Sequence, residues 1–238
     1  MNAWNPLVSV VIPALDEEKY IGRVIKCLKD QDYPQDKIEI IVVDNGSVDK
    51  TAEVSEKLGA KVLKLKQRGV SLARQKGSEI AKGDIISGVD ADVVLPKNWI
   101  TEMVSVLSDN EVVGVTGIIR AHSKSLWIQF LYIISFEFYF LVSFVTRHVY
   151  FSGMNFGVKR DAFFKSGGFN IDLKAGEDLD LSLKVAKFGK LLFSRKVVVY
   201  SSTRRMKEGA FTSFWRYIVT FFAIRWGIGK APGFHNYR

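Results

Sequence analysis

The chain has 238 residues, enough for one compact α/β domain with a large core. Its single cysteine, Cys27, excludes an internal disulfide and cysteine-based zinc clusters, and it indicates a reducing compartment. The formal net charge of +9 favours anionic partners such as phosphates, nucleic acid or acidic lipid surfaces, but does not choose between them.

Apolar runs and segments of helical spacing alternate through the first half of the chain. Strands separated by helices of this length predict an α/β fold with a doubly wound, mostly parallel sheet and helices on both faces. We predict strands over residues 7–12, 38–43, 61–65 and 84–89, and helices over residues 17–28, 70–81 and 96–107, with a further helix ending at residue 58.

Three aspartates follow two of the predicted strands. Asp44 comes after residues 38–43, and Asp90 and Asp92 come after residues 84–89. In an open α/β sheet, ligands bind at the edge formed by the carboxyl ends of the strands. Two carboxylates one residue apart suit a hard divalent cation that leaves positions open for phosphate oxygens. The sequence therefore predicts a nucleotide-diphosphate site, although Asp44 could instead cap the following helix.

Other charged motifs allow a functional and a structural interpretation. Arg74, on the helix over 70–81, could reach diphosphate oxygens with its planar fork, or it could be an exposed surface arginine. Glu177 and Asp178 begin a helix, where they could favour its dipole or could deprotonate an acceptor hydroxyl. The chain contains no Gly-x-x-x-x-Gly-Lys, Gly-x-Gly-x-x-Gly, His-Glu-x-x-His or Gly-x-Ser-x-Gly motif.

Taken in order, the motifs resemble those of a known family. They lie at residues 13–17, 43–51, 73–77, 90–92, 167–169 and 176–178. The series resembles the inverting glycosyltransferases of family 2, which have the GT-A fold, and the resemblance runs from about residue 7 to residue 200. It implies a single glycosyltransferase domain over 1–238. Within it, residues 1–120 would bind the nucleotide-sugar, residues 121–200 would form the acceptor and catalytic half, and residues 201–238 would form an amphipathic helix.

The resemblance also assigns roles to individual residues. Asp178 would be the catalytic base, assisted by Glu177, and Asp92 with Asp90 would bind Mg²⁺ or Mn²⁺ in an Asp-x-Asp motif. Asn45 stands where many relatives have a second aspartate. The remaining substrate-binding residues would be Pro13, Ala14, Leu15, Glu17, Asp44, Asn45, Arg74, Asp90, Ala91, Gly153 and Asn155.

The implied activity is metal-dependent transfer of a sugar, with inversion, from a UDP- or GDP-sugar to a glycan or polyprenyl-lipid acceptor, and not to nucleic acid. Processive relatives carry Gln-x-x-Arg-Trp, of which only Arg225 and Trp226 are kept here, so single-sugar transfer is expected. A nucleotidyltransferase is one alternative, but residues 14–18 are acidic where that class needs a basic, glycine-rich stretch. A non-catalytic nucleotide-sugar-binding subunit is another.

Two segments, residues 126–151 and 211–226, are dense in aromatic and aliphatic side chains. Residues 126–145 are almost long enough to cross a bilayer. A single crossing, however, would separate Asp90 and Asp92 from Glu177 and Asp178. We therefore predict a cytoplasmic protein attached peripherally or monotopically to the inner face of the membrane. A buried core helix and a homodimer interface are the alternatives.

Overall fold

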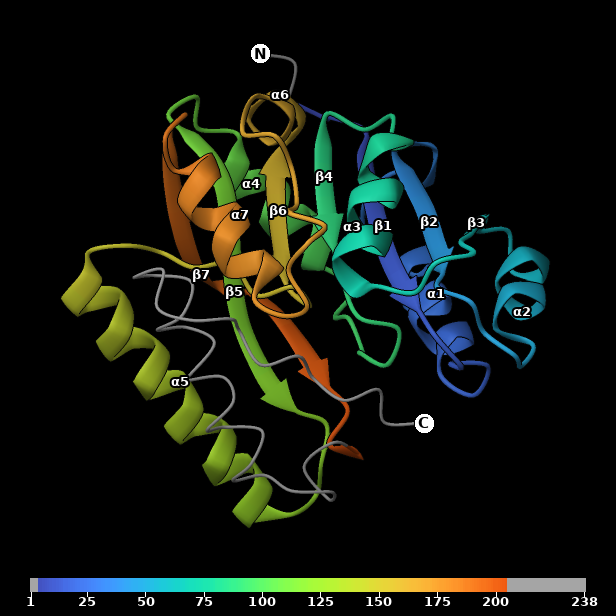
Figure 1. The fold of residues 1–238 in the computed structure, drawn as a ribbon. Coiled ribbons are helices and arrows are strands. Elements are labelled where there is room, and N and C mark those ends of the chain that lie inside the picture. Colours follow the sequence, from blue (N-terminus) through green and yellow to red (C-terminus); the bar gives the residue numbers. More distant parts are fainter. Residues whose placement is uncertain (1–3, 205–238) are drawn as a thin grey trace.

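The computed structural model describes residues 4–204, without the side chains of residues 135 and 136. Seven strands form one sheet in the order β3-β2-β1-β4-β6-β5-β7 (Figure 1). Four strand pairs are parallel, and β6 is antiparallel to both of its neighbours, so the predicted mostly parallel sheet is confirmed. The strands are β1 (Val8–Ala14), β2 (Ile38–Asp44), β3 (Lys61–Lys64), β4 (Ile85–Gly88), β5 (Val112–Ala121), β6 (Phe156–Lys159) and β7 (Lys190–Ser201).

Helices cover both faces of the sheet. One face packs against α1 (Ile21–Lys29), α2 (Thr51–Lys57) and α4 (Trp99–Leu107), and the other against α3 (Val70–Glu79), α6 (Arg160–Lys165) and α7 (Glu177–Val185). Alternate residues of β1 enter the two cores, Val10 and Ile12 on the first face and Val11 on the second. A strand buried on both faces reads as a continuous apolar run, which is why the sequence predicts β1 so directly.

The three strands of the second half were not predicted. β5 contains Gly114 and Gly117, which interrupt its apolar pattern, and β6 has only four residues. The glycine at 114 is required by packing, because a Cβ there would lie 2.5 Å from the ring of Phe151. The helix that we expected to begin at Glu177 is present as α7, and a shorter helix, α6, precedes it.

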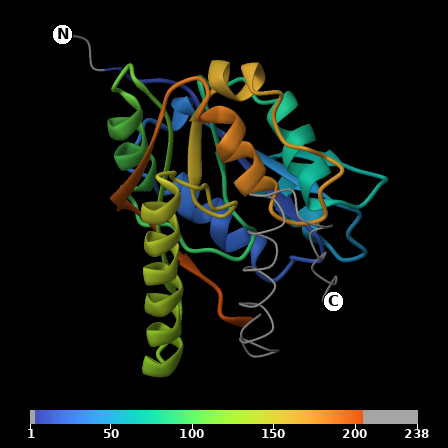
Figure 2. The ribbon, with the colours of Figure 1, turned by 60° about the vertical axis from the view of Figure 1, so that its left-hand side comes forward.

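Helix α5 (Leu126–Thr146) lies outside both helical layers and extends along the end of the sheet beside β5 (Figures 1 and 2). Its contact with the sheet is narrow, with the rings of Tyr139 and Phe140 at 5.7 and 5.0 Å from the ring of Phe193 in β7. Large apolar side chains of α5 are exposed along its length, namely those of Leu126, Trp127, Phe130, Ile133, Ile134, Leu141, Phe144 and Val145. The helix expected over 201–238 lies outside the described residues beyond position 204.

Gly77 sets how closely α3 approaches the sheet. A Cβ at this position would lie 2.4 Å from a methyl carbon of Val11 and 2.8 Å from one of Val43. Replacing Gly77 with Ala should therefore destabilise the protein by about 2 kcal/mol, because two β-branched core side chains would have to move. Gly22 on α1 is the matched control, since a Cβ there would meet its nearest neighbour, Leu58, at 3.4 Å. Gly22→Ala should be neutral or stabilising by about 0.5 kcal/mol. Chemical denaturation measures both, and equal effects would contradict this account of α3 packing.

Candidate functional site

The carboxyl ends of three parallel strands meet at one edge of the sheet. Ala14 at the end of β1 pairs with Asp44 at the end of β2, and Gly88 at the end of β4 pairs with Val11 of β1. Pro13 precedes Ala14 on β1, and Leu15 is the first residue after the strand. Because the strands are parallel and adjacent, the loops after them lie next to each other, which is where the sequence predicts the donor site.

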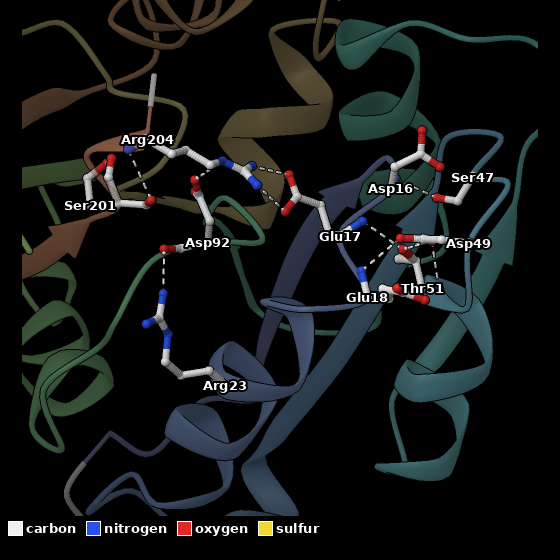
Figure 3. A network of polar contacts seen from close by, with 11 residues as sticks. Asp16, Glu17, Glu18, Arg23, Ser47, Asp49, Thr51, Asp92, Ser201 and Arg204 are labelled. Carbon is white, nitrogen blue, oxygen red and sulfur yellow. Dashed lines mark hydrogen bonds and ion pairs between the residues drawn. The ribbon is translucent and has the colours of Figure 1, made fainter. Parts of the chain in front are cut away.

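The loop after β1 is fastened to the turn after β2. Asp16 has a left-handed backbone conformation with φ 55°, and its carboxylate accepts a hydrogen bond of 2.8 Å from the backbone N–H of Val48. Three backbone N–H groups of the loop donate in return to side chains of the turn (Figure 3): Asp16 to Ser47 (3.0 Å), Glu17 to Thr51 (2.7 Å) and Glu18 to Asp49 (3.0 Å).

Asp44 and Asn45 are buried and hold neighbouring loops. The Asp44 carboxylate accepts a hydrogen bond of 3.0 Å from the backbone N–H of Ser47, in the turn before α2, and the N-cap of α2 is Lys50, so Asp44 does not cap that helix. The side-chain oxygen of Asn45 accepts one of 2.9 Å from the backbone N–H of Gly69. Both side chains thus shape the edge of the site, and nucleoside contact by either of them stays a prediction.

Arg74 is the centre of a buried polar network, which we call the Arg74 network. Its side chain comes from α3 and is 5% exposed. The guanidinium donates to Asp90 Oδ1 (2.8 Å), to the carbonyl of Gly153 (2.7 Å) and to Glu177 Oε1 (3.2 Å). All three nitrogens thus have protein partners. Arg74 thus positions Asp90 and Glu177 and is not the exposed surface arginine of the alternative interpretation, while its contact with the diphosphate stays a prediction.

Asp178 is held against Gly153 at the start of α7. Its Oδ2 accepts a hydrogen bond of 2.7 Å from the backbone N–H of Gly153, whose carbonyl is bound by Arg74. Burial raises the pKa of the Asp178 carboxyl, because the charged form loses solvation. Burial also raises the pKa of Glu177, helped by the charge of Asp178 and opposed by Arg74. A carboxylate with a raised pKa suits a general base.

A second guanidinium, that of Arg204, lies on the other side of the Asp-x-Asp motif. Its Nε is 3.0 Å from Asp92 Oδ2, and its two terminal nitrogens bind both carboxylate oxygens of Glu17, one of them at 2.8 Å (Figure 3). The guanidinium carbon lies 4.7 Å from the centre of the Tyr20 ring. We call these four residues the Arg204 cluster. Sequence reasoning missed Arg204, because no local motif surrounds it and its partners are far away in the chain.

Asn155 has a structural role instead of the substrate contact expected from sequence. Its side chain is fully buried, and its amide nitrogen donates to the carbonyls of Ile118 (3.0 Å) and Val197 (3.1 Å). Its amide oxygen accepts from the indole of Trp99 at 2.9 Å. Both donors and the acceptor are therefore used inside the core, and Asn155 is withdrawn from the candidate ligands.

Asp90 and Asp92 fit a divalent cation in their chemistry. Within the part of the chain that the structure describes, no group of three or more His, Cys, Asp or Glu side chains forms a metal cluster. The two aspartates, however, supply hard oxygen donors, and each faces a guanidinium, Arg74 or Arg204. Positive charge, supplied by these two guanidinium groups, therefore lies next to both carboxylates. Diphosphate oxygens and water would complete the coordination.

Comparison with known proteins gives consistent matches. Residues 9–170 match the family model described as glycosyl transferase family 2. "Probable glycosyltransferase YdaM" of Bacillus subtilis is 31% identical over 202 residues, covering 77% of this chain and 47% of YdaM. The chain spans about half the length of the curated relatives it matches. The chain belongs to glycosyltransferase family 2.

Solved structures agree on the fold. The mannosyltransferase PcManGT from Pyrobaculum calidifontis, in complex with GDP-Man and Mn²⁺, has a TM-score of 0.78 at 24% identity, covering 97% of this chain and 67% of PcManGT. TarS 1-349 of S. aureus in complex with UDP-GlcNAc has a TM-score of 0.66 at 19% identity, covering 91% and 66%. The fold is thus that of GT-A glycosyltransferases, as the sequence predicts.

The Arg74 network predicts a specific energetic coupling. Arg74→Met should destabilise the protein by about 3 kcal/mol, because Glu177 and Asp90 would lose the cation that compensates their burial. Adding Glu177→Gln to that variant should cost less than the sum of the single changes by about 1 kcal/mol or more, since the uncompensated carboxylate is then removed. A double-mutant cycle by chemical denaturation measures this, and strict additivity would contradict a shared network.

Proposed function

We propose that this chain transfers a single sugar from a nucleoside-diphosphate sugar to an acceptor hydroxyl, with inversion at the anomeric carbon. The observation that carries the proposal is the Arg74 network. One buried guanidinium binds Asp90, on the donor edge of the sheet, and Glu177, beside the proposed base. The donor side and the base side of the site are therefore held at a fixed separation, as an in-line displacement requires.

In the proposed reaction the acceptor oxygen attacks the anomeric carbon from the side of Asp178. The Asp178 carboxylate takes the hydroxyl proton as the new carbon–oxygen bond forms and the bond to the diphosphate breaks. The backbone N–H of Gly153 orients one oxygen of that carboxylate. Glu177 is a positioning residue in this scheme, because its carboxylate is bound to Arg74.

Asp90 and Asp92 would hold Mg²⁺ or Mn²⁺. When bound, the cation neutralises the charge that builds on the departing nucleoside diphosphate. The complexes of PcManGT with GDP-Man and Mn²⁺, and of TarS with UDP-GlcNAc, support a nucleotide-sugar donor and, for PcManGT, a divalent cation. Both UDP- and GDP-sugars are candidate donors for this chain.

We further propose that the acceptor is lipid-linked or close to a membrane, and that α5 docks there from the cytoplasmic side. Among the described residues, α5 has the length and apolar composition to cross a bilayer. Its exposed face includes Leu126 at 80% and Phe144 at 82%. Lys124 and Arg147 flank the helix, where an anionic leaflet would attract them.

The connections of α5 support a helix lying in the membrane surface over one that crosses the bilayer. Its 21 residues span about 31 Å, close to the thickness of the hydrocarbon layer. Its first residue follows β5 by only a short loop, and Tyr150, just beyond its end, is buried in the protein. A crossing helix would pull one of these two anchored ends to the far side of the membrane.

Two single substitutions separate donor binding from chemistry. Asp92→Asn should weaken divalent-cation-dependent binding of the donor, because the diphosphate would lose a cation ligand. Asp178→Asn should leave donor affinity nearly unchanged and lower turnover by about a hundredfold or more. The reason is that the proton is transferred to this carboxylate only in the transition state, so donor binding does not need it. Calorimetric titration with UDP- and GDP-sugars, with and without chelator, measures binding, and release of nucleoside diphosphate measures turnover.

The two variants serve as controls for each other, since both remove one negative charge. Loss of donor affinity in Asp178→Asn with full turnover at saturation would contradict the assignment of the base. Full donor binding by Asp92→Asn in the presence of chelator would contradict the metal assignment.

Membrane docking predicts that apolar side chains of α5 drive liposome binding. Changing Trp127, Phe130 and Phe144 together to Ser should weaken binding to vesicles containing acidic lipid by about a thousandfold or more, because each ring buried in lipid contributes about 2 kcal/mol. Phe164 is also exposed, and it lies on α6, away from α5 (Figures 1 and 2), so Phe164→Ser is the control. Co-sedimentation measures binding. A wild-type protein that ignores vesicles but is a dimer, and becomes a monomer in the triple variant, would instead assign α5 to a subunit interface.

A further inference from the structure

Arg204 places a positive charge between two buried carboxylates of the site. Its guanidinium contacts the carboxylates of Glu17 and Asp92, which come from the loops after β1 and β4 (Figure 3). Both acidic residues are buried, at 8% and 6% exposure. Two carboxylates brought close in a buried place repel each other, so the guanidinium between them stabilises the loops on which they lie.

The contacts of Arg204 differ in strength. Glu17 is bound by two terminal nitrogens in a planar fork, and the ring of Tyr20 lies beneath the guanidinium. Arg204 reaches the Asp92 carboxylate with its Nε, at 3.0 Å. The contact with Asp92 is therefore the one that can break while Arg204 stays bound to Glu17 and Tyr20.

We propose that Arg204 is a positioning residue that stands in for the divalent cation at Asp92 and competes with it. The inference rests on the proposed function, in which Asp92 is a cation ligand. A cation bound to Asp92 and a guanidinium hydrogen-bonded to the same carboxylate repel each other, so binding of either one weakens the other. Arg204 thus holds Asp92 in place without metal and discourages cation binding before the donor arrives. The diphosphate, by adding two negative groups, shifts the balance toward the cation.

The competition predicts that removing Arg204 strengthens cation binding in the absence of nucleotide. Arg204→Met should lower the dissociation constant for Mn²⁺ on the order of fivefold, the range expected for a partly exposed ion pair. Arg204→Lys keeps the charge and should stay close to wild type. Mn²⁺ titration followed by electron paramagnetic resonance measures free Mn²⁺ directly and needs no activity. Added nucleoside diphosphate should reduce the difference between wild type and Arg204→Met.

Arg23 supplies a matched control. Its Nη2 donates to the backbone carbonyl of Asp92 at 3.1 Å. Arg23 is therefore a second arginine that binds Asp92, through the backbone of that residue and not through its carboxylate. Arg23→Met removes the same charge from the same neighbourhood and should change the Mn²⁺ dissociation constant by less than about twofold. An equal gain in Arg23→Met and Arg204→Met would overturn the proposal, since it would reflect net charge alone.

A third variant separates failure of this inference from failure of the proposed function. If Asp92→Asn lowers Mn²⁺ affinity but Arg204→Met does not raise it, the metal site stands and the competition is refuted. If Asp92→Asn binds Mn²⁺ as wild type does, the cation does not use Asp92, and both the metal assignment and this inference fail. Thermal unfolding of each variant shows whether it is folded. If Arg204→Met is not folded, Arg204→Gln replaces it in the titration, because glutamine also removes the positive charge beside Asp92 but can still hydrogen-bond to Glu17.

Discussion

The arrangement of the site depends on one buried guanidinium. Arg74 lies on α3, which packs on β1 and β2, and it contacts the loop after β4, the loop before β6 and the first turn of α7. Each contact satisfies a group whose burial would otherwise be costly, so the three segments are stable only in the positions that keep those hydrogen bonds. Removing one partner of a buried ion pair lowers the free energy of unfolding by far more than the intact pair adds to it. Such pairs therefore constrain the geometry strongly but contribute little net stability.

Positive charge is distributed on both sides of the Asp-x-Asp motif. Asp90 faces Arg74, which is buried and has a protein partner for each of its three nitrogens, while Asp92 faces Arg204, which is partly exposed and reaches the site from the end of β7. The first pair is fixed by packing, and the second can exchange partners at lower cost. The two aspartates are one residue apart, yet each is bound by a different guanidinium, one from α3 and one from just beyond β7.

The sequence predicts the first half of the fold well because each element there carries its own signal. Strands β1, β2 and β4 are buried on both faces and read as apolar runs, and the carboxylates at their ends mark the binding edge. The second half depends on long-range packing instead. β5 is interrupted by glycines whose function is to admit Phe151 and Val197, residues that no local pattern connects with them.

The same distinction separates the site residues. Asp90, Glu177 and Asp178 belong to short motifs at element ends, so the sequence finds them. Arg74 was found, but its partners were not, because a buried guanidinium and an exposed one look alike in a helical pattern. Arg204 and the internal role of Asn155 have no local signature at all. Their roles follow from contacts with Asp92 and Trp99, which only the folded chain brings close.

Helix α5 is joined to the catalytic half through its packing. The side chain of Tyr139 donates to the carbonyl of Tyr150 at 3.0 Å, and Tyr139 and Val142 pack with Tyr150 and Leu179 of α7. Tyr150 lies three residues before Gly153, whose N–H binds the Asp178 carboxylate. A surface that binds α5 is therefore linked by short, buried connections to the helix that carries the proposed base. In the proposed reaction, an acceptor held at that surface would approach the site from the side of Asp178. For a displacement that inverts the anomeric carbon, this is the side from which the attacking hydroxyl must come.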